Sequence, residues 1–161
     1  YFERIKEVIA ERSGHNVLMG ISDENETYIT FQMTYKEAIN ALEIAHIRKK
    51  ECPVVWNEKI GYWKLLKDMS QQQQCKEFVS KKIDALIQYD KENESDLIET
   101  LEALVNHLGA RNITATSLYL HRNTLMYRIK KIENLTGYDL SDPESILELS
   151  LALRLKKFMN Q

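Results

Sequence analysis

The feature that most constrains the fold of this 161-residue chain is the spacing of apolar residues between positions 112 and 137. Ala115 and Leu118 lie three residues apart, as neighbours on one face of a helix do, and Leu120 follows after a short interval. Apolar residues then return with a helical period, at Leu125, Ile129 and Ile132. The pattern predicts two short helices that pack against each other across a tight turn.

The expected bounds of these helices are residues 114–120 and 122–136, and Gly137 is placed to end the second one. A residue as small as Ala115 allows two helices to cross closely. Glycine is often found near the turn of a helix-turn-helix, whereas this chain has Tyr119 there. We therefore expect a looser or shifted turn, with the tyrosine ring packed against the protein.

The second helix is predicted to expose a polar and basic face once its apolar residues are buried. The residues expected on or near this face are His121, Arg122, Asn123, Thr124, Tyr127, Arg128, Lys130 and Lys131. Arginine grips guanine through two hydrogen bonds and asparagine suits adenine, whereas hydroxyls, cations and helix N-terminal amides bind phosphate oxygens. The face therefore has the chemistry of a recognition helix in the major groove of double-stranded DNA.

Within this set, Arg122 and Asn123 are the expected base readers. Phosphate contacts are expected from Thr124, Tyr127, Arg128, Lys130 and Lys131. Either arginine has the chemistry for either role. His121 has two open roles, because a residue just before the helix is placed to cap it or to contact a phosphate.

The formal net charge of −2 does not by itself favour a nucleic-acid partner, but the charge is unevenly distributed. Residues 109–135 contain five basic residues and one acidic residue, whereas residues 71–108 contain four basic and eight acidic residues. A basic segment in an acidic protein is expected where phosphates are contacted. A solvated basic face would give the same counts, so the charge supports a DNA partner only together with the helix pattern.

The first 67 residues mix strand and helix periods, which predicts an α+β fold for this part. The expected strands cover residues 17–21 and 52–56, and the expected helices cover residues 35–48 and 61–66. Thr34 and Glu37 have the spacing of a capping box for the first of these helices. Its predicted apolar stripe consists of Ala38, Ile39, Leu42 and Ala45. The aromatic residues Trp56, Tyr62 and Trp63 are expected in the core rather than around a ligand.

After residue 67 the pattern becomes entirely helical. Residues 68–74 are expected to form a hinge that leads into a helix ending near Tyr89. The charged residues 90–95 are expected to form a loop. The next helix has apolar positions at Leu97, Leu101, Leu104, Val105 and Leu108, and Gly109 is placed to end it. The last helix is expected to open with a cap and an early proline at residues 141–144. Its predicted core face consists of Ile146, Leu149, Leu153 and Leu155.

Residues 97–155 resemble the C-terminal helix-turn-helix of PucR/CdaR-type transcription regulators. The resemblance is carried by LIETLEALV, then HRNTLMYRIKKIENLTG, then DLSDPE and LELSLAL, in that order and spacing. It implies a sequence-specific transcriptional regulator, an activator of a metabolic operon, that binds double-stranded DNA. A single recognition helix reads only a few base pairs, so we expect a homodimer whose two helices lie about one DNA turn apart.

Residues 17–66 more weakly resemble the C-terminal half of the GGDEF-like domain that precedes this domain in the family, through MGIS, TYKEAINALEIA and VVW followed by GYWKLL. True GGDEF domains condense two GTP molecules, but the Gly-Gly-acid-acid signature is absent from this sequence. The resemblance therefore implies a degenerate domain for dimerisation or signal relay, and no enzyme. The expected organisation is a partial GGDEF-like domain at 1–67, a connecting helix and loop at 68–95, and the helix-turn-helix domain at 96–161.

No metal or cofactor site is predicted. The histidines, His15, His46, His107 and His121, are scattered, and Cys52 and Cys75 have no partners at motif spacing. No apolar run is long enough to span a membrane and no export signal opens the chain, so we expect a cytoplasmic location. The helical pattern is already under way at Tyr1, which indicates a fragment of a longer protein. The alternatives to a DNA-binding regulator are a protein-interaction or dimerisation module and a degenerate nucleotide-binding domain without catalysis.

Overall fold

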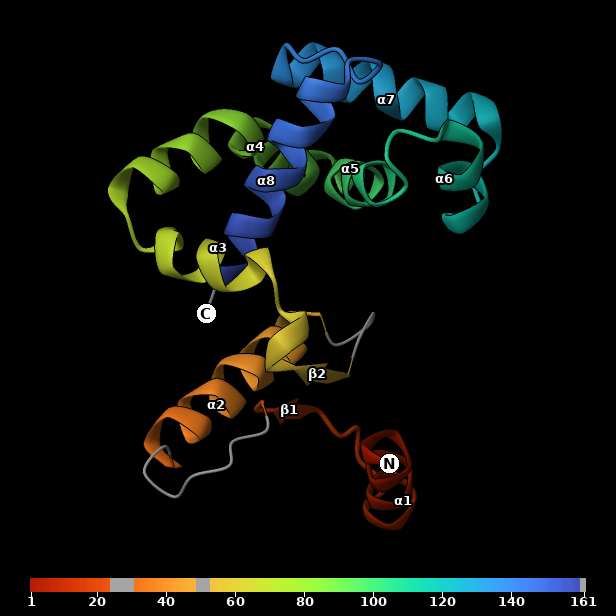
Figure 1. The fold of residues 1–161 in the computed structure, drawn as a ribbon. Helices are drawn as coiled ribbons and strands as arrows, with labels where there is room; N and C mark the ends of the chain where they lie inside the picture. The colour runs from red at the N-terminus through yellow and green to blue at the C-terminus, as the bar shows by residue number, and fades with distance from the viewer. Residues whose placement is uncertain (24–30, 49–52, 160–161) are drawn as a thin grey trace. The chain divides into compact units, whose positions relative to one another are not determined.

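The computed structural model describes residues 1–23, 31–48 and 53–159 (Figure 1). The chain divides into two compact units, Tyr1–Asp68 and Met69–Gln161. The first unit combines two strands with helices, and the described residues of the second contain helices without a strand. The α+β and all-α compositions agree with the sequence pattern.

The first unit is built around a two-stranded parallel sheet. Its elements are α1 (Phe2–Ser13), β1 (Met19–Ile21), α2 (Phe31–Ile47), β2 (Val54–Trp56), the 3-10 helix η2 (Asn57–Lys59) and α3 (Tyr62–Ser70), whose last residues pass into the second unit. Gly20 of β1 is in register with Val55 of β2, and α2, which connects the strands, packs on both. Phe2 of α1 meets the Trp56 ring edge to face, with 5.2 Å between centroids. The result is a β-α-β unit with α1 against β2.

Gly20 allows α2 to lie directly against the sheet. A Cβ atom at this position would lie 2.2 Å from the Leu42 nitrogen and 2.3 Å from the Ala38 carbonyl oxygen. Both of these atoms belong to the helix backbone and have no rotamer by which to move away. The glycine of the MGIS segment is therefore required by close packing between strand and helix.

Three expectations about this unit are wrong. Helix α2 begins at Phe31, so Thr34 and Glu37 lie inside it and form no capping box at its start. Its fully buried residues are Ala41, Ile44 and Ala45. Leu42, expected in the apolar stripe, is 38% exposed, because it is the backbone of Leu42 that lies against Gly20. Of the aromatic residues expected in the core, Trp63 is buried, but Tyr62 is half exposed and stacks on it. The predicted strand start at Cys52 lies outside the described residues.

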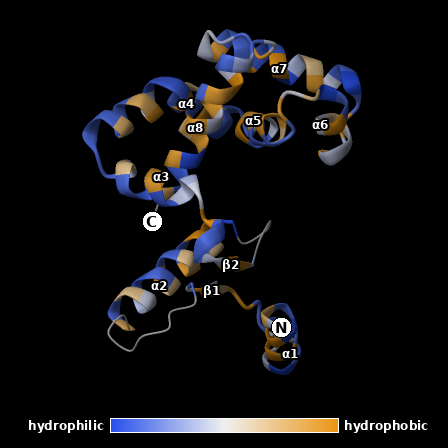
Figure 2. Ribbon diagram, in the orientation of Figure 1, coloured by the Kyte–Doolittle hydropathy of each residue, from blue (hydrophilic) through white to orange (hydrophobic). Residues whose placement is uncertain are grey.

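The described residues of the second unit form five helices, besides the end of α3. Its helices are α4 (Gln73–Asn93), α5 (Leu97–Asn106), α6 (Arg111–Ser117), α7 (Arg122–Thr136) and α8 (Pro143–Met159). Helices α4 and α5 pack on each other and on both α7 and α8, while α6 packs on α5 and α7. Figure 2 shows hydrophobic residues concentrated along α5 and α8, which lie at the centre of this unit. Helix α4, expected as a connecting segment, is thus part of the second unit's core.

The centre of this core is made of side chains that are at most 2% exposed. They are Ile83 and Leu86 of α4, Leu101 and Leu104 of α5, Leu125, Ile129 and Ile132 of α7, Leu140, and Leu149, Ala152 and Leu155 of α8. The buried faces of α5, α7 and α8 thus match the predicted apolar positions, with one exception. Leu108 is 88% exposed, because α5 ends at Asn106 and the chain turns through positive φ at Leu108 and Gly109.

Helix α4 is longer than expected and differs at both ends. Residues 68–74 contain the end of α3 and the start of α4, so the predicted hinge is reduced to a break between Ser70 and Gln73. At the other end, the helix continues through the predicted loop to Asn93. Gln88 donates to Glu92 over 2.8 Å, and the Asn93 amide donates to the Tyr89 carbonyl over 3.0 Å. These contacts one turn apart stabilise a charged helical end that has no apolar residues.

The opening of α8 confirms the predicted cap and early proline. Pro143 is the first helical residue, and the Asp142 carboxylate accepts hydrogen bonds from the backbone nitrogen and hydroxyl of Ser145, over 2.9 and 2.8 Å. These hydrogen bonds lower the pKa of Asp142 below its ordinary value. These hydrogen bonds therefore fix the end of the α7–α8 loop and the start of α8.

Candidate nucleic-acid interface

Helices α6 and α7 form the predicted helix-turn-helix, with α6 in a shifted position. It covers Arg111–Ser117 instead of 114–120. Its fully buried residue is Thr114, whereas Ala115 is only half-buried. The Thr114 hydroxyl donates to the Ala110 carbonyl over 2.9 Å, so its polar group is satisfied inside the helix and the rest of the side chain is free to pack. A polar residue thus takes the place expected for the small one.

The turn between the helices holds Tyr119 in a left-handed conformation, with φ of 54°. Its backbone nitrogen donates to Thr116, and the next residue, Leu120, donates to the Ala115 carbonyl over 2.9 Å. The turn is therefore closed by backbone hydrogen bonds and tolerates a non-glycine residue. The expectation that the tyrosine ring packs on the protein is wrong, because the residue is 96% exposed.

Helix α7 has the predicted bounds, and a defined cap occupies each end. The His121 Nδ1 atom accepts a hydrogen bond from the Asn123 backbone nitrogen over 3.2 Å, and Gly137 ends the helix with φ of 75°. Of the two roles left open for His121, the structure shows the cap. The helix is thus held in a fixed frame from its first turn.

The outward face of α7 is polar and has a regular spacing. Its exposed residues Asn123, Tyr127, Lys130 and Asn134 follow one another at intervals of four, three and four, and therefore lie in one row. Arg122 and Thr124 are exposed beside the start of this row. Asn134 was not among the predicted site residues, although the same helical spacing, continued one turn further, identifies it.

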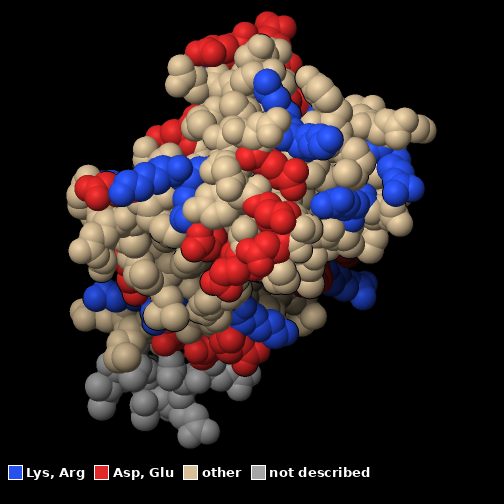
Figure 3. Space-filling model, turned by 90° about the horizontal axis from the view of Figure 1, so that it is seen from above, with Lys and Arg blue, Asp and Glu red and all other residues tan. Residues whose placement is uncertain are grey.

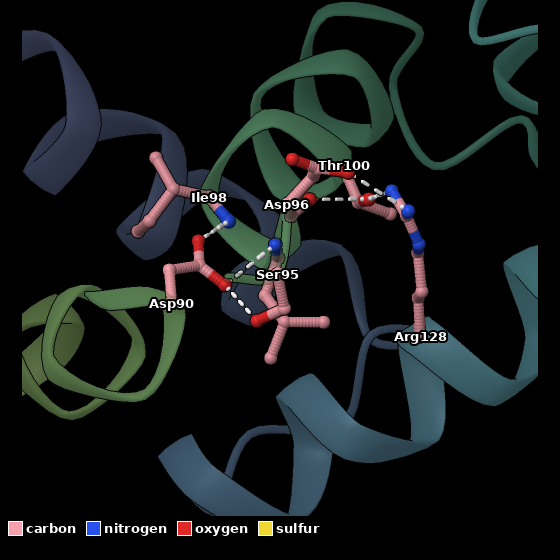
Figure 4. Close-up of polar contacts among 7 residues, drawn as sticks. Asp90, Ser95, Asp96, Ile98, Thr100 and Arg128 are labelled. Carbon is pink, nitrogen blue, oxygen red and sulfur yellow. Dashed lines mark hydrogen bonds and ion pairs between the residues drawn. The ribbon is translucent and has the colours of Figure 1, made fainter. Parts of the chain in front are cut away.

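Two of the predicted site residues are directed to partners outside α7. Arg128 Nη2 lies 3.0 Å from Asp96 Oδ2 and Arg128 Nη1 lies 3.0 Å from the Thr100 hydroxyl, and the arginine side chain is 22% exposed (Figure 4). The Lys131 ammonium lies 4.4 Å from the centre of the Tyr89 ring. The structure thus brings six of the eight predicted residues, His121 to Thr124 with Tyr127 and Lys130, to the exposed start and outer row of α7.

The one carboxylate of α7 is directed to the following loop. The Glu133 Oε1 atom accepts a hydrogen bond from the Leu140 backbone nitrogen over 3.0 Å, and the exposed residues of the helix include no acid. Figure 3 shows acidic side chains across the middle of one view of the molecule and basic side chains to their right, the side on which α6 and the start of α7 lie in Figure 1. Basic side chains also lie to the left of the acidic ones in this view, so the local excess of positive charge belongs to α7 itself, whose exposed residues include no acid.

Residues 97–155 match the family described as the PucR C-terminal helix-turn-helix domain. The proline-responsive transcriptional activator PutR of Bacillus subtilis (strain 168) is 30% identical over 142 residues, which cover 88% of this chain and 34% of the relative. The purine catabolism regulatory protein of the same strain is 28% identical over 160 residues, which cover 99% of this chain and 30% of the relative. The carbohydrate diacid regulator of Escherichia coli (strain K12) is 41% identical over 64 residues, or 40% of this chain and 17% of the relative.

The chain spans about a third of the length of PutR and of the purine catabolism regulator. Within the described ranges, no helix combines the length and apolarity that crossing a bilayer requires. The matched residues begin at the start of α5 and end in α8, and so include both helices of the motif together with α5 and most of α8. Residues 97–155 are a helix-turn-helix domain of the PucR C-terminal type.

Proposed function

We propose that this chain is the DNA-binding part of a transcriptional regulator, with α7 as the recognition helix in the major groove of double-stranded DNA. One observation carries the proposal. Helix α7 buries one face completely and presents on the other a row of Asn123, Tyr127, Lys130 and Asn134 without an acidic residue. Amides, a hydroxyl and a cation on an exposed helix are the groups that bind base edges and phosphates.

The proposed role of each residue follows from its position along α7. Arg122 and Asn123 lie at the N-terminal end, which enters the groove deepest, and are the proposed base readers. Thr124, Tyr127 and Lys130 are the proposed phosphate contacts. Asn134 lies eleven residues beyond Asn123, about 16 Å along the axis, and is proposed to meet the sugar-phosphate backbone. His121 contributes by fixing the first turn.

The full protein is proposed to act as a homodimer in the cytoplasm and to activate a metabolic operon, without catalytic activity. The names of two relatives, a proline-responsive transcriptional activator and a purine catabolism regulatory protein, support this role. The first unit is proposed to be a degenerate GGDEF-like domain that serves dimerisation or signal relay. Its parallel β1–α2–β2 unit supports that assignment.

Selection of bound duplexes from a random pool by the full-length protein tests the proposal. We expect one recovered sequence with two half-sites about one DNA turn, roughly 34 Å, apart. Affinity for that duplex is expected to fall steeply with added salt, because phosphate contacts release counterions. Arg122→Ala and Asn123→Ala are expected to cost about 1–3 kcal/mol, mainly at one base position each. Binding without salt dependence, or equal losses on selected and random duplexes, would contradict the assignment.

A further inference from the structure

The N-terminus of α5 is capped by an aspartate from the preceding helix. Asp96 occupies the N-cap position, but its side chain forms no capping hydrogen bond. Instead, the carboxylate of Asp90 accepts from the backbone nitrogens of Leu97 and Ile98, each over 2.8 Å, and from the Ser95 hydroxyl (Figure 4). Because Asp90 satisfies the start of α5, the carboxylate of Asp96 is available for another partner.

That partner is Arg128 of α7. Its guanidinium donates from two nitrogens to two acceptors of the first turn of α5, the Asp96 carboxylate and the Thr100 hydroxyl. Thr100 is fully buried, and its hydroxyl proton is donated to the Asp96 carbonyl over 2.7 Å, which leaves the oxygen lone pairs for Arg128. The planar arginine fork fits this pair of acceptors, whereas a lysine ammonium lacks that geometry.

The contact of Lys131 with Tyr89 continues this attachment along α7. Tyr89 and Asp90 are consecutive residues of α4. The C-terminal end of α4 therefore contacts Lys131 through Tyr89 and caps α5 through Asp90. Arg128 directly follows Tyr127 of the exposed row, and Lys131 directly follows Lys130. Successive residues are separated by about 100° around a helix. A rotation of α7 about its axis would therefore break both contacts and turn the exposed row away from its present direction.

We propose that Arg128 is a positioning residue, which fixes the rotation of α7 through Asp96 and Thr100 and so sets the direction of the base-reading residues. This inference rests on the proposed function and replaces the expectation that Arg128 contacts a phosphate. The two roles predict opposite effects for Asp96→Asn. If Arg128 positions the helix, loss of the Asp96 charge loosens α7 and weakens specific binding. If Arg128 binds a phosphate, the same substitution releases the guanidinium and removes a repelling charge, so binding becomes tighter.

The experiment measures the affinity of the full-length protein for the selected duplex and for a random duplex across a range of salt concentrations. The variants are Asp96→Asn, Arg128→Met and Arg128→Lys. Glu99→Gln is the matched control for Asp96, because it removes an exposed negative charge from the same turn of α5. Lys130→Met is the control for Arg128, because it removes an exposed cation from the outer row. Circular dichroism establishes that each variant is folded.

We expect Asp96→Asn to lower affinity for the selected duplex several-fold relative to Glu99→Gln, with little change on the random duplex. Arg128→Met and Arg128→Lys are both expected to lower the ratio of specific to random affinity. Neither is expected to change the salt slope, which is the slope of log affinity against log salt concentration. Lys130→Met, in contrast, is expected to lower this slope by about one. A merely stabilising role would leave that ratio unchanged in the folded variants, and so would overturn the inference. Arg128 would instead be assigned to a phosphate contact by three results together. Arg128→Met would reduce the salt slope, Arg128→Lys would preserve it, and Asp96→Asn would bind DNA more tightly. A protein that selects no duplex would overturn the proposed function together with this inference.

Discussion

Lys82 on α4 donates a hydrogen bond to the carboxylate of Glu148 on α8, and this ion pair joins two helices of the second unit. The same ammonium lies 4.5 Å from the centre of the Tyr138 ring and 4.9 Å from that of Phe78. The hydrogen bond from Lys82 lowers the pKa of Glu148. Burial by itself would lower the pKa of Lys82, but hydrogen bonds to Glu148 and Tyr138 outweigh burial and the pKa is raised.

The pair therefore stabilises the second unit across the neutral range. The contribution of Glu148 is present above the ordinary glutamate pKa, about 4.3, and is lost as the pH falls through the lowered value in the folded state. The contribution of Lys82 is present below the ordinary lysine pKa, about 10.4, and is lost as the pH rises through the raised value. We expect Glu148→Gln to lower the unfolding temperature at neutral pH. We also expect the unfolding temperature of this variant to decrease less as the pH is lowered, as measured by thermal unfolding over a pH series. Glu144→Gln, on the exposed first turn of α8, is the control. If the unfolding temperatures of Glu148→Gln and the parent protein fall equally steeply in acid, the ion pair contributes nothing to stability.

Gly20→Ala is expected to unfold the first unit. The added methyl group would overlap backbone atoms of Leu42 and Ala38, and overlap with backbone in a packed interface is expected to cost more than about 3 kcal/mol. Both tryptophans, Trp56 and Trp63, lie in this unit, so their fluorescence during denaturant unfolding reports on it. Gly61→Ala is the control, because a Cβ there meets open space and only the positive φ is unfavourable, at about 1–2 kcal/mol. Equal unfolding midpoints for the two variants would exclude close packing as the reason for Gly20.

Helix α7 was predictable because burial on one side leaves a direct record in the sequence. Leu125, Ile129 and Ile132 recur with the helical period, and Gly137 supplies the left-handed residue at the end. The exposed row follows from the same period. The partner of Arg128 was not predictable, since the acceptors Asp96 and Thr100 lie 32 and 28 residues earlier in the chain. Two cations on one helix look alike in sequence, and tertiary packing decides which of them meets solvent.

Helix ends were predicted less well than helix faces, for reasons that differ between positions. Thr34 and Glu37 have capping-box spacing, but α2 extends back to Phe31 and includes both. Leu108 continues the apolar period of α5, yet the positive φ of Leu108 and Gly109 turns the chain away from the core. Thr114 is polar in sequence and buried in the fold, because its hydroxyl bonds to the carbonyl one turn earlier. Each case depends on local backbone hydrogen bonding that residue type alone does not specify.

Tyr119→Gly is expected to stabilise the protein. The tyrosine is 96% exposed and has φ of 54°, a conformation that costs a residue with a Cβ about 1–2 kcal/mol more than glycine. Glycine also increases the entropy of the unfolded chain, which offsets about 0.4–1 kcal/mol, so a net gain of about 0.5–1 kcal/mol is expected in chemical denaturation. Tyr127→Gly makes the same chemical change inside α7 and is expected to destabilise by about 0.5 kcal/mol. Destabilisation by both substitutions would show that the exposed ring of Tyr119 has a stabilising partner.

Lys130 and Lys131 are adjacent, and we expect their substitution by alanine to have different consequences. Lys130 is exposed on the outer row, so Lys130→Ala should reduce the slope of log affinity against log salt by about one and leave stability within about 0.5 kcal/mol of the parent protein. Lys131 lies over the Tyr89 ring, so Lys131→Ala should destabilise by about 0.5–1 kcal/mol and leave the slope unchanged. Salt titrations of duplex binding and denaturant unfolding of the same two variants measure both quantities. Equal slopes for the two variants would mean that α7 approaches DNA with a different side, because residues 130 and 131 are separated by about 100° around the helix.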